Sequence, residues 1–176
     1  MDTSNLRHRQ DGLSLVEVTI ATGIIASALV GLAQLFAISI ASNHSATTLT
    51  YTAVLAEQKI EQLRALAWSF DDGGRPLSDP ALSPSPPETL TANTPGWVDY
   101  VDQFGRVVGE GAAPPPKAVY IRRWSIEPLP NNPANTIAIQ VLVTARTNRG
   151  SADRAGSSAR LPGESRLVAV KTRKAL

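Results

Sequence analysis

The chain has 176 residues, of which 43% are hydrophobic, and a formal net charge of only +2. It contains no cysteine, which excludes disulfide scaffolds, thiolate metal sites and thiol redox chemistry. The small net charge and scattered basic residues give no tract typical of nucleic-acid binding, so nucleic acid is not an expected partner. Much of the apolar content lies before residue 45, and the folded domain must therefore be smaller than the length suggests.

A long apolar segment follows a short polar leader. No residue between Val18 and Ala56 is formally charged. Residues 18–41 are long enough, at about 1.5 Å per residue, for roughly 36 Å of helix, and a hydrocarbon layer is about 30 Å thick. Arg7 and Arg9 precede this segment, and the next basic residue is Lys59. The positive-inside rule therefore predicts a single span with a cytoplasmic N-terminus and an exported C-terminal part.

The junction between leader and apolar segment differs from an ordinary signal peptide. A cleaved secretory signal has a shorter apolar core that ends in small residues, and this apolar run continues into Ser- and Thr-rich sequence instead. The polar leader, residues 1–12, ends at Gly12, directly before Leu13. Glu17 is the one acidic residue that follows Gly12 before the long uncharged stretch.

Residues 12–17, Gly-Leu-Ser-Leu-Val-Glu, resemble the processing and methylation site of type IV prepilins and type II secretion pseudopilins. That family has Gly, an apolar residue and Glu at this spacing. The resemblance implies that a prepilin peptidase cuts between Gly12 and Leu13 on the cytoplasmic side and methylates the new amino group of Leu13. Most major pilins have Phe at this position and a Pro midway along the apolar helix. The sequence departs from both, which favours a minor pilin or a minor pseudopilin.

Glu17 is energetically demanding in an apolar helix. A carboxylate near the bilayer centre costs about 2.5 to 3.5 kcal/mol, and a helix N-terminus returns only about 0.3 to 1 kcal/mol. Cleavage after Gly12 would create a mostly protonated α-amino group on Leu13, one helical turn before Glu17. The resemblance implies that Glu17 neutralises the amino terminus of a neighbouring subunit during assembly. The alternative is that Glu17 only lies at the interface, at the positive end of the helix dipole.

Small residues follow the apolar helix at four-residue spacing. One row consists of Gly23, Ser27 and Gly31, and a second of Ala33, Ala37 and Ala41. Rows of this kind let helix backbones approach closely, and they predict a helix-packing surface. The alternative is that they reflect composition alone, because small residues are common in membrane helices. The resemblance implies four partners: the prepilin peptidase, other pilin or pseudopilin subunits, an inner-membrane assembly platform and membrane lipid.

The helical pattern continues beyond the span. Apolar residues recur at intervals of three and four, whereas polar residues fall off that stripe, and no proline occurs before residue 76. The stripe consists of Leu49, Ala53, Ala56, Ile60, Leu63 and Ala67, with Glu57, Gln58, Glu61 and Arg64 outside it. We expect one helix to about Trp68 whose stripe faces a sheet. A coiled coil is the alternative, but alanine at half of the positions makes a poor seam.

The remaining chain has the pattern of a small sheet. Residues 69–96 are rich in Pro and Gly and predict a loop. Strands are expected over residues 97–101, 106–108, 118–127, 136–147 and 164–173, with Ile137, Ile139, Val141 and Val143 on one face. A helix followed by an antiparallel meander is an α+β fold. The resemblance implies a pilin-like form of it: a long N-terminal helix, its first half transmembrane, packs through its second half on a small antiparallel sheet.

The predicted organisation therefore has five parts: a leader (1–12), a transmembrane and assembly helix (13–41), an amphipathic continuation (42–68), a Pro-rich loop (69–96) and the exported sheet (97–176). The expected location is the inner (cytoplasmic) membrane as a single pass, and then a pilus or pseudopilus after assembly. An uncleaved, membrane-anchored binding or sensor domain is the main alternative.

No enzymatic motif is present. The two histidines, His8 and His44, flank the apolar segment, and there is no P-loop, dinucleotide fingerprint or paired-His zinc motif. We therefore expect no catalysis, no cofactor and no metal.

Two further hypotheses rest on particular residues. Asp99 and Asp102 carry carboxylates, which are oxygen ligands suited to calcium, and the resemblance adds that some pseudopilins bind calcium. A turn between two short strands is the preferred interpretation. A DNA-uptake pilin would bind nucleic acid through Arg122, Arg123 or the loop at residues 151–163, for which a solvated connection is the simpler interpretation.

Overall fold

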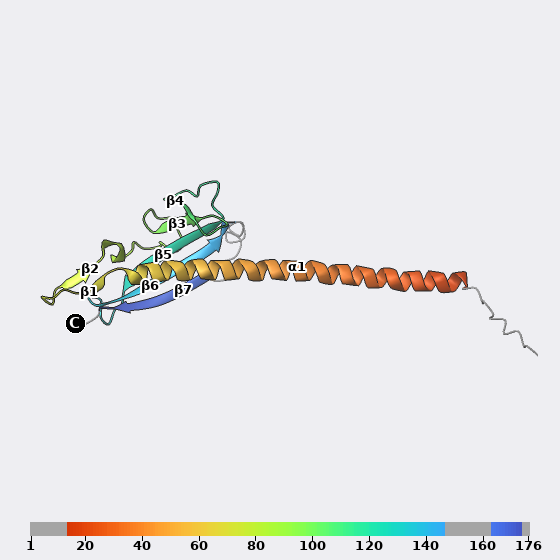
Figure 1. Cartoon of the computed structure of the whole chain (residues 1–176), viewed down its shortest axis with the longest axis horizontal. Helices are drawn as coiled ribbons and strands as arrows, with labels where there is room; N and C mark the ends of the chain where they lie inside the picture. Colours follow the sequence, from red (N-terminus) through yellow and green to blue (C-terminus); the bar gives the residue numbers. More distant parts are fainter. Residues whose placement is uncertain (1–13, 147–162, 174–176) are drawn as a thin grey trace, which may run out of the picture. The chain divides into compact units, whose positions relative to one another are not determined.

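The computed structural model describes residues 14–146 and 163–173. They belong to two units, Met1–Asn43 and His44–Leu176. The predicted processing residues Gly12 and Leu13 lie outside the described residues, as do residues 147–162 and 174–176. The fold is α+β, with one long N-terminal helix and a small antiparallel sheet (Figure 1).

The N-terminal helix α1 spans Leu15–Ala65. Its residues include no proline, so nothing interrupts the backbone hydrogen bonds of the helix. The predicted end near Trp68 is wrong by three residues, because Trp68 already pairs with Ser78 in a hairpin. The Nζ atom of Lys171 donates to the carbonyl oxygens of Arg64, at 2.6 Å, and of Leu66. A lysine from a distant strand thus caps the C-terminus of α1.

The Pro-rich segment is more ordered than the predicted loop. Strand β1 (Trp68–Phe70) pairs with β2 (Pro76–Ser78), and a short 3-10 helix, η1 (Pro80–Leu82), follows. The Oδ1 atom of Asp71 accepts hydrogen bonds from the backbone N–H groups of Gly73 and Arg75 and so stabilises the hairpin turn. Asp79 caps η1 by accepting from Ala81 N at 2.9 Å. Side-chain acceptors at these turns order a segment that proline content alone indicates to be irregular.

Arg173 fastens this hairpin to the sheet. Its guanidinium donates to the carbonyl oxygens of Ser69 and Leu77 at 3.1 and 2.8 Å and to Ser78 Oγ at 2.6 Å. The same group lies 3.7 Å from the ring centroid of Trp68. One arginine thus contacts both hairpin strands.

We expect Arg173→Ala to loosen the hairpin selectively. Loss of several charged hydrogen bonds should speed amide exchange in residues 68–78 by about tenfold or more. Hydrogen-exchange mass spectrometry would measure this. Arg166→Ala is the control, since Arg166 lies in the strand that directly precedes Arg173 and its guanidinium donates to Gln140 rather than to the hairpin. Equal exchange in the two variants would show that the arginine does not hold the hairpin.

The sheet has five antiparallel strands. They are β3 (Val98–Val101), β4 (Val107–Glu110), β5 (Tyr120–Pro128), β6 (Thr136–Ala145) and β7 (Ser165–Thr172). Their spatial order is β4-β3-β5-β6-β7. The predicted simple meander is wrong in one connection, because β5 pairs with β3 and leaves β4 at the edge.

The core lies between the second half of α1 and one face of the sheet (Figure 1). The predicted inward face of β6 is confirmed: its four aliphatic residues, Ile137, Ile139, Val141 and Val143, are all buried. On α1 the predicted stripe is right for Ala56, Ile60 and Leu63. Leu49 and Ala67 are exposed instead, and the buried set also contains Thr52, Leu55 and Lys59. Glu57, Gln58, Glu61 and Arg64 are exposed, as predicted.

Strand β5 is buried on both faces. Trp124 and Ile126 join the core under α1, whereas Ile121 belongs to a second, smaller core with Val98 and Tyr100. Beyond the end of β3, Ser85 replaces a neighbouring strand: its N–H donates to Ile126 O at 2.9 Å, and its Oγ accepts from Ile126 N at 3.2 Å. Residues before the sheet in sequence therefore complete the environment of its central strand.

Candidate functional site

The first candidate site is the N-terminal part of α1. Every described residue from Ser14 to Thr47 is exposed, including large apolar residues such as Leu29 and Phe36. A helix that is apolar all round must be covered by lipid or by other protein segments. By length and composition this helix can cross a membrane. In the isolated chain this part of the helix therefore lacks the cover that its apolar side chains require.

Glu17 lies in the first turn of α1 and is exposed. The first backbone hydrogen bond in this turn joins Val18 N to Ser14 O at 3.1 Å. A carboxylate here interacts favourably with the unpaired N–H groups of the helix N-terminus. The predicted partner of Glu17, the amino group of a processed Leu13, lies outside the described part of the chain. The pairing between them stays a prediction.

The predicted packing row is open. A Cβ atom built on Gly23 or Gly31 would meet no heavy atom within 4 Å among those of the structure. Ser27, between them, donates its hydroxyl to Ile24 O at 2.8 Å. The row therefore has room for another helix and presents no unsatisfied hydroxyl to it.

Two threonine hydroxyl groups near the start of the apolar segment are also bonded within the helix. Thr19 Oγ1 donates to Leu15 O at 2.8 Å, and Thr22 Oγ1 donates to Val18 O at 2.6 Å. Because these bonds are local, the polar groups need no partner in lipid or in a neighbouring subunit. Glu17 differs from them in carrying a full charge.

A second candidate site, which the sequence reading missed, is a cluster of three buried charged residues. Asp99 is 2% exposed, Arg122 4% and Lys59 8%. Arg122 Nε and Nη2 donate to the two carboxylate oxygens of Asp99 at 2.8 and 2.9 Å, and Lys59 Nζ donates to Oδ2 at 3.1 Å. Strand register brings the first pair together, since Asp99 lies directly opposite Arg122 across β3 and β5.

The cluster also joins the sheet to α1. Arg122 Nη1 donates to Leu55 O at 3.1 Å and to Gln58 Oε1 at 3.3 Å. Lys59 Nζ lies 3.7 Å from the ring centroid of Trp124. Burial lowers the pKa of Lys59, and the neighbouring Asp99 carboxylate opposes this shift. Two cations and one anion give the three buried side chains a net charge of one positive unit.

This cluster corrects two sequence hypotheses. Arg122 and Arg123 are buried, and Arg123 donates to Asn93 Oδ1 through Nε and Nη2, so neither side chain presents a cation to nucleic acid. Residues 151–162 of the other proposed DNA-binding segment lie outside the described residues. Asp99 is a buried ion-pair residue in β3 rather than a turn residue.

Asp102 fits the turn interpretation. Its Oδ1 accepts from Phe104 N and Arg106 N at 2.8 and 2.9 Å, between β3 and β4. Gly105 in the same turn has a φ of 80°, which favours glycine. Across residues 14–146 and 163–173, no group of three His, Asp or Glu side chains is placed to hold a metal ion.

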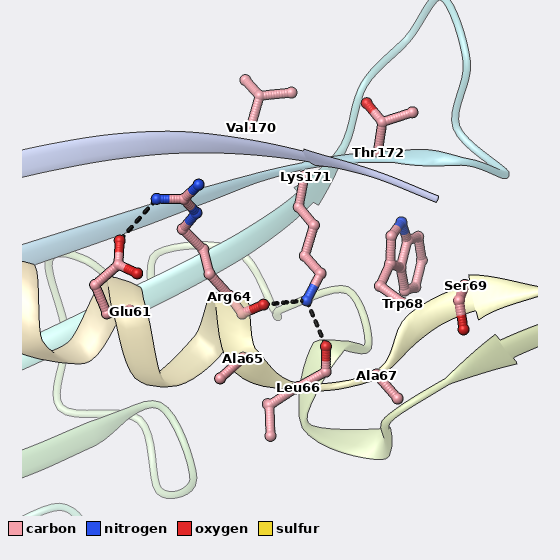
Figure 2. Close-up of a pocket in the computed structure, with 10 residues that line it drawn as sticks. All are labelled: Glu61, Arg64, Ala65, Leu66, Ala67, Trp68, Ser69, Val170, Lys171 and Thr172. Atoms are coloured by element: carbon pink, nitrogen blue, oxygen red, sulfur yellow. Dashed lines mark hydrogen bonds and ion pairs between the residues drawn. The ribbon is translucent and has the colours of Figure 1, made fainter. Parts of the chain in front are cut away.

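A cleft of about 580 Å³ lies at the C-terminal end of α1 (Figure 2). Its polar groups already bind one another: Arg64 pairs with Glu61 at 2.7 Å, and Lys171 reaches the carbonyl oxygens of Arg64 and Leu66. Figure 2 shows the Trp68 ring beside these groups. The lining of this cleft combines a helix cap with a surface ion pair and offers no nucleophile next to a base.

Comparisons with known proteins leave the family open. The sequence matches no family model and no curated protein, and the fold matches no solved structure.

Proposed function

We propose that this chain is a structural subunit of a helical filament, a minor type IV pilin or a minor type II secretion pseudopilin. It catalyses no reaction. Its N-terminal helix anchors it in the inner membrane after synthesis and then packs against other subunits. The exposed, apolar N-terminal part of α1, with Glu17 in its first turn, is the observation that supports this proposal most.

The leader junction supports processing. Gly12 precedes an apolar residue, and Glu17 follows at the spacing of prepilin processing sites. Cleavage there would leave α1 almost without a polar extension at its N-terminus. The predicted methyl group on the amine of Leu13 would leave that amine positively charged.

The fold supports different roles for the two parts of α1. The part of α1 from Ser14 to Thr47 has no cover of its own, whereas residues Thr52 to Leu63 contribute to the core of the sheet-bearing unit. One segment thus remains available for lipid or for neighbouring helices. The core of the sheet-bearing unit does not include that surface.

Processing is tested by intact-mass spectrometry of the chain from membranes of cells with and without a prepilin peptidase. With the peptidase we expect an N-terminus at methylated Leu13, and without it an intact Met1. Gly12→Val is the control, because a branched side chain should block a site that takes glycine. An intact Met1 in the presence of an active peptidase would contradict the proposal and support an uncleaved membrane-anchored domain.

A further inference from the structure

A second cleft opens beside the buried charge cluster. It has a volume of about 320 Å³ and is lined by residues of α1, of η1 and of the segment before β3. The side chains that matter are those of Lys59, Leu63, Leu66, Trp97 and Trp124, with Ala81 at the rim. The volume is at the lower end of the range for small-molecule sites.

The walls of this cleft are aromatic and aliphatic. The rings of Trp97 and Trp124 lie with their centroids 6.4 Å apart at an interplanar angle of 50°. Trp97 is half-buried, so part of its ring is available to a ligand. Leu63 and Leu66 supply the apolar surface on the helix side. Such walls suit one planar, apolar ring.

Lys59 supplies the polar group of the cleft. An ammonium group has three N–H donors. One donates to Asp99 Oδ2, and the ring of Trp124 lies against the ammonium at 3.7 Å. These contacts leave donor capacity on an ammonium that lines the cleft.

The net positive charge of the cluster favours an anionic ligand. Lys59 and Arg122 outnumber Asp99 by one positive charge in a buried region. Glu110, opposite Asp99 on β4, is exposed, and water screens its charge. An anion in the cleft would compensate the excess at short range, where a buried charge has the greatest need of a partner.

We infer that the cleft binds a small aromatic monocarboxylate, with its carboxylate on Lys59 and its ring against Trp97 and the two leucines. This inference is independent of the proposed filament function. The cleft combines an aromatic wall, a cation with remaining donor capacity and space for one ring.

The test uses phenylacetate as the probe and the full chain in detergent micelles. A Trp68→Phe background leaves Trp97 and Trp124 as the two tryptophans, so fluorescence reports on the cleft. Phenylacetamide, which has the same ring without the charge, and acetate, which has the charge without the ring, are the comparison probes. We expect saturable quenching by phenylacetate and binding at least about tenfold weaker for both others.

Three variants locate the site. Lys59→Met should remove the preference for the acid over the amide, because Asp99 keeps its bidentate contact with Arg122 and the fold is retained. Ala81→Phe, at an exposed rim position, should fill the cleft and abolish binding without altering the core. Lys171→Met, at the other cleft, should bind phenylacetate like the parent. Equal binding of acid and amide by the parent, or no saturable binding, would overturn the inference. Unchanged binding by Ala81→Phe would also overturn it, because it would mean that the probe binds elsewhere or partitions into the micelles.

Discussion

Replacing Asp99 by Asn should lower the free energy of unfolding by about 3 to 5 kcal/mol, the cost of leaving buried charges without their counter-ion. Asp99 is the anion shared by Lys59 and Arg122, and all three side chains are buried. Asn retains the shape and one acceptor oxygen but not the charge. The two cations would then lie next to each other in the core between α1 and the sheet.

Lys59→Met is the matched control. It removes one cation from the same cluster but leaves Asp99 with two hydrogen bonds from Arg122. The remaining pair is neutral overall, and the burial that lowers the pKa of Lys59 no longer opposes folding. We expect a change of about 1 kcal/mol or less, because a methionine fills a similar volume.

Urea unfolding of the full chain in micelles measures both effects. Tryptophan fluorescence reports on the sheet-bearing unit, since Trp68, Trp97 and Trp124 all belong to it. A parent-like midpoint for Asp99→Asn, or an equal loss for the two variants, would show that the charge balance of the cluster does not determine stability.

Glu17→Ala should reduce incorporation into filaments by at least about a hundredfold while processing after Gly12 continues. The proposed partner of Glu17 is the amino terminus of a neighbouring subunit, in an apolar bundle of helices. Removing one member of such a pair leaves the other charge buried and unpaired, at a cost of about 3 to 5 kcal/mol, and about 2.8 kcal/mol already corresponds to a hundredfold change.

Glu57→Ala is the control for this prediction. Glu57 is an exposed acid on the same helix, beyond the apolar segment. The measurement is the ratio of chain in sheared filaments to chain in membranes, with the N-terminus of each pool determined by mass spectrometry. If Glu17→Ala assembles like Glu57→Ala in processed form, Glu17 has no role in assembly, and the interfacial interpretation of this residue replaces the proposed one.

The sequence predicts the elements of this fold better than their pairing. Local patterns were sufficient for α1 and for the buried face of β6, because both depend on periodicity within one segment. The position of β5 next to β3 depends on contacts between distant segments. The β1–β2 hairpin likewise depends on Arg173, about a hundred residues later in the chain, which no local pattern reveals.

The charge cluster was missed for a related reason. The helical pattern leaves Lys59 outside the apolar stripe, because a lysine on a helix is expected to be solvated. Asp99 and Arg122 acquire their meaning only from the register of two strands. One signal is present in the sequence: Arg122 shares a strand face with Trp124 and Ile126, and a charge on an apolar strand face requires a buried partner.

Strand β7 contacts α1 at both of its ends, through Ser165 with Thr52 at 2.8 Å and through Lys171 with the carbonyl oxygen of Arg64. These contacts join residues more than a hundred positions apart. A chain is synthesised from its N-terminus, so α1 is made first and Lys171, which contacts the end of α1, is made among the last residues. The sheet-bearing unit can therefore close only after nearly all of the chain has been synthesised, and until then the buried stripe of α1 has no sheet to pack against.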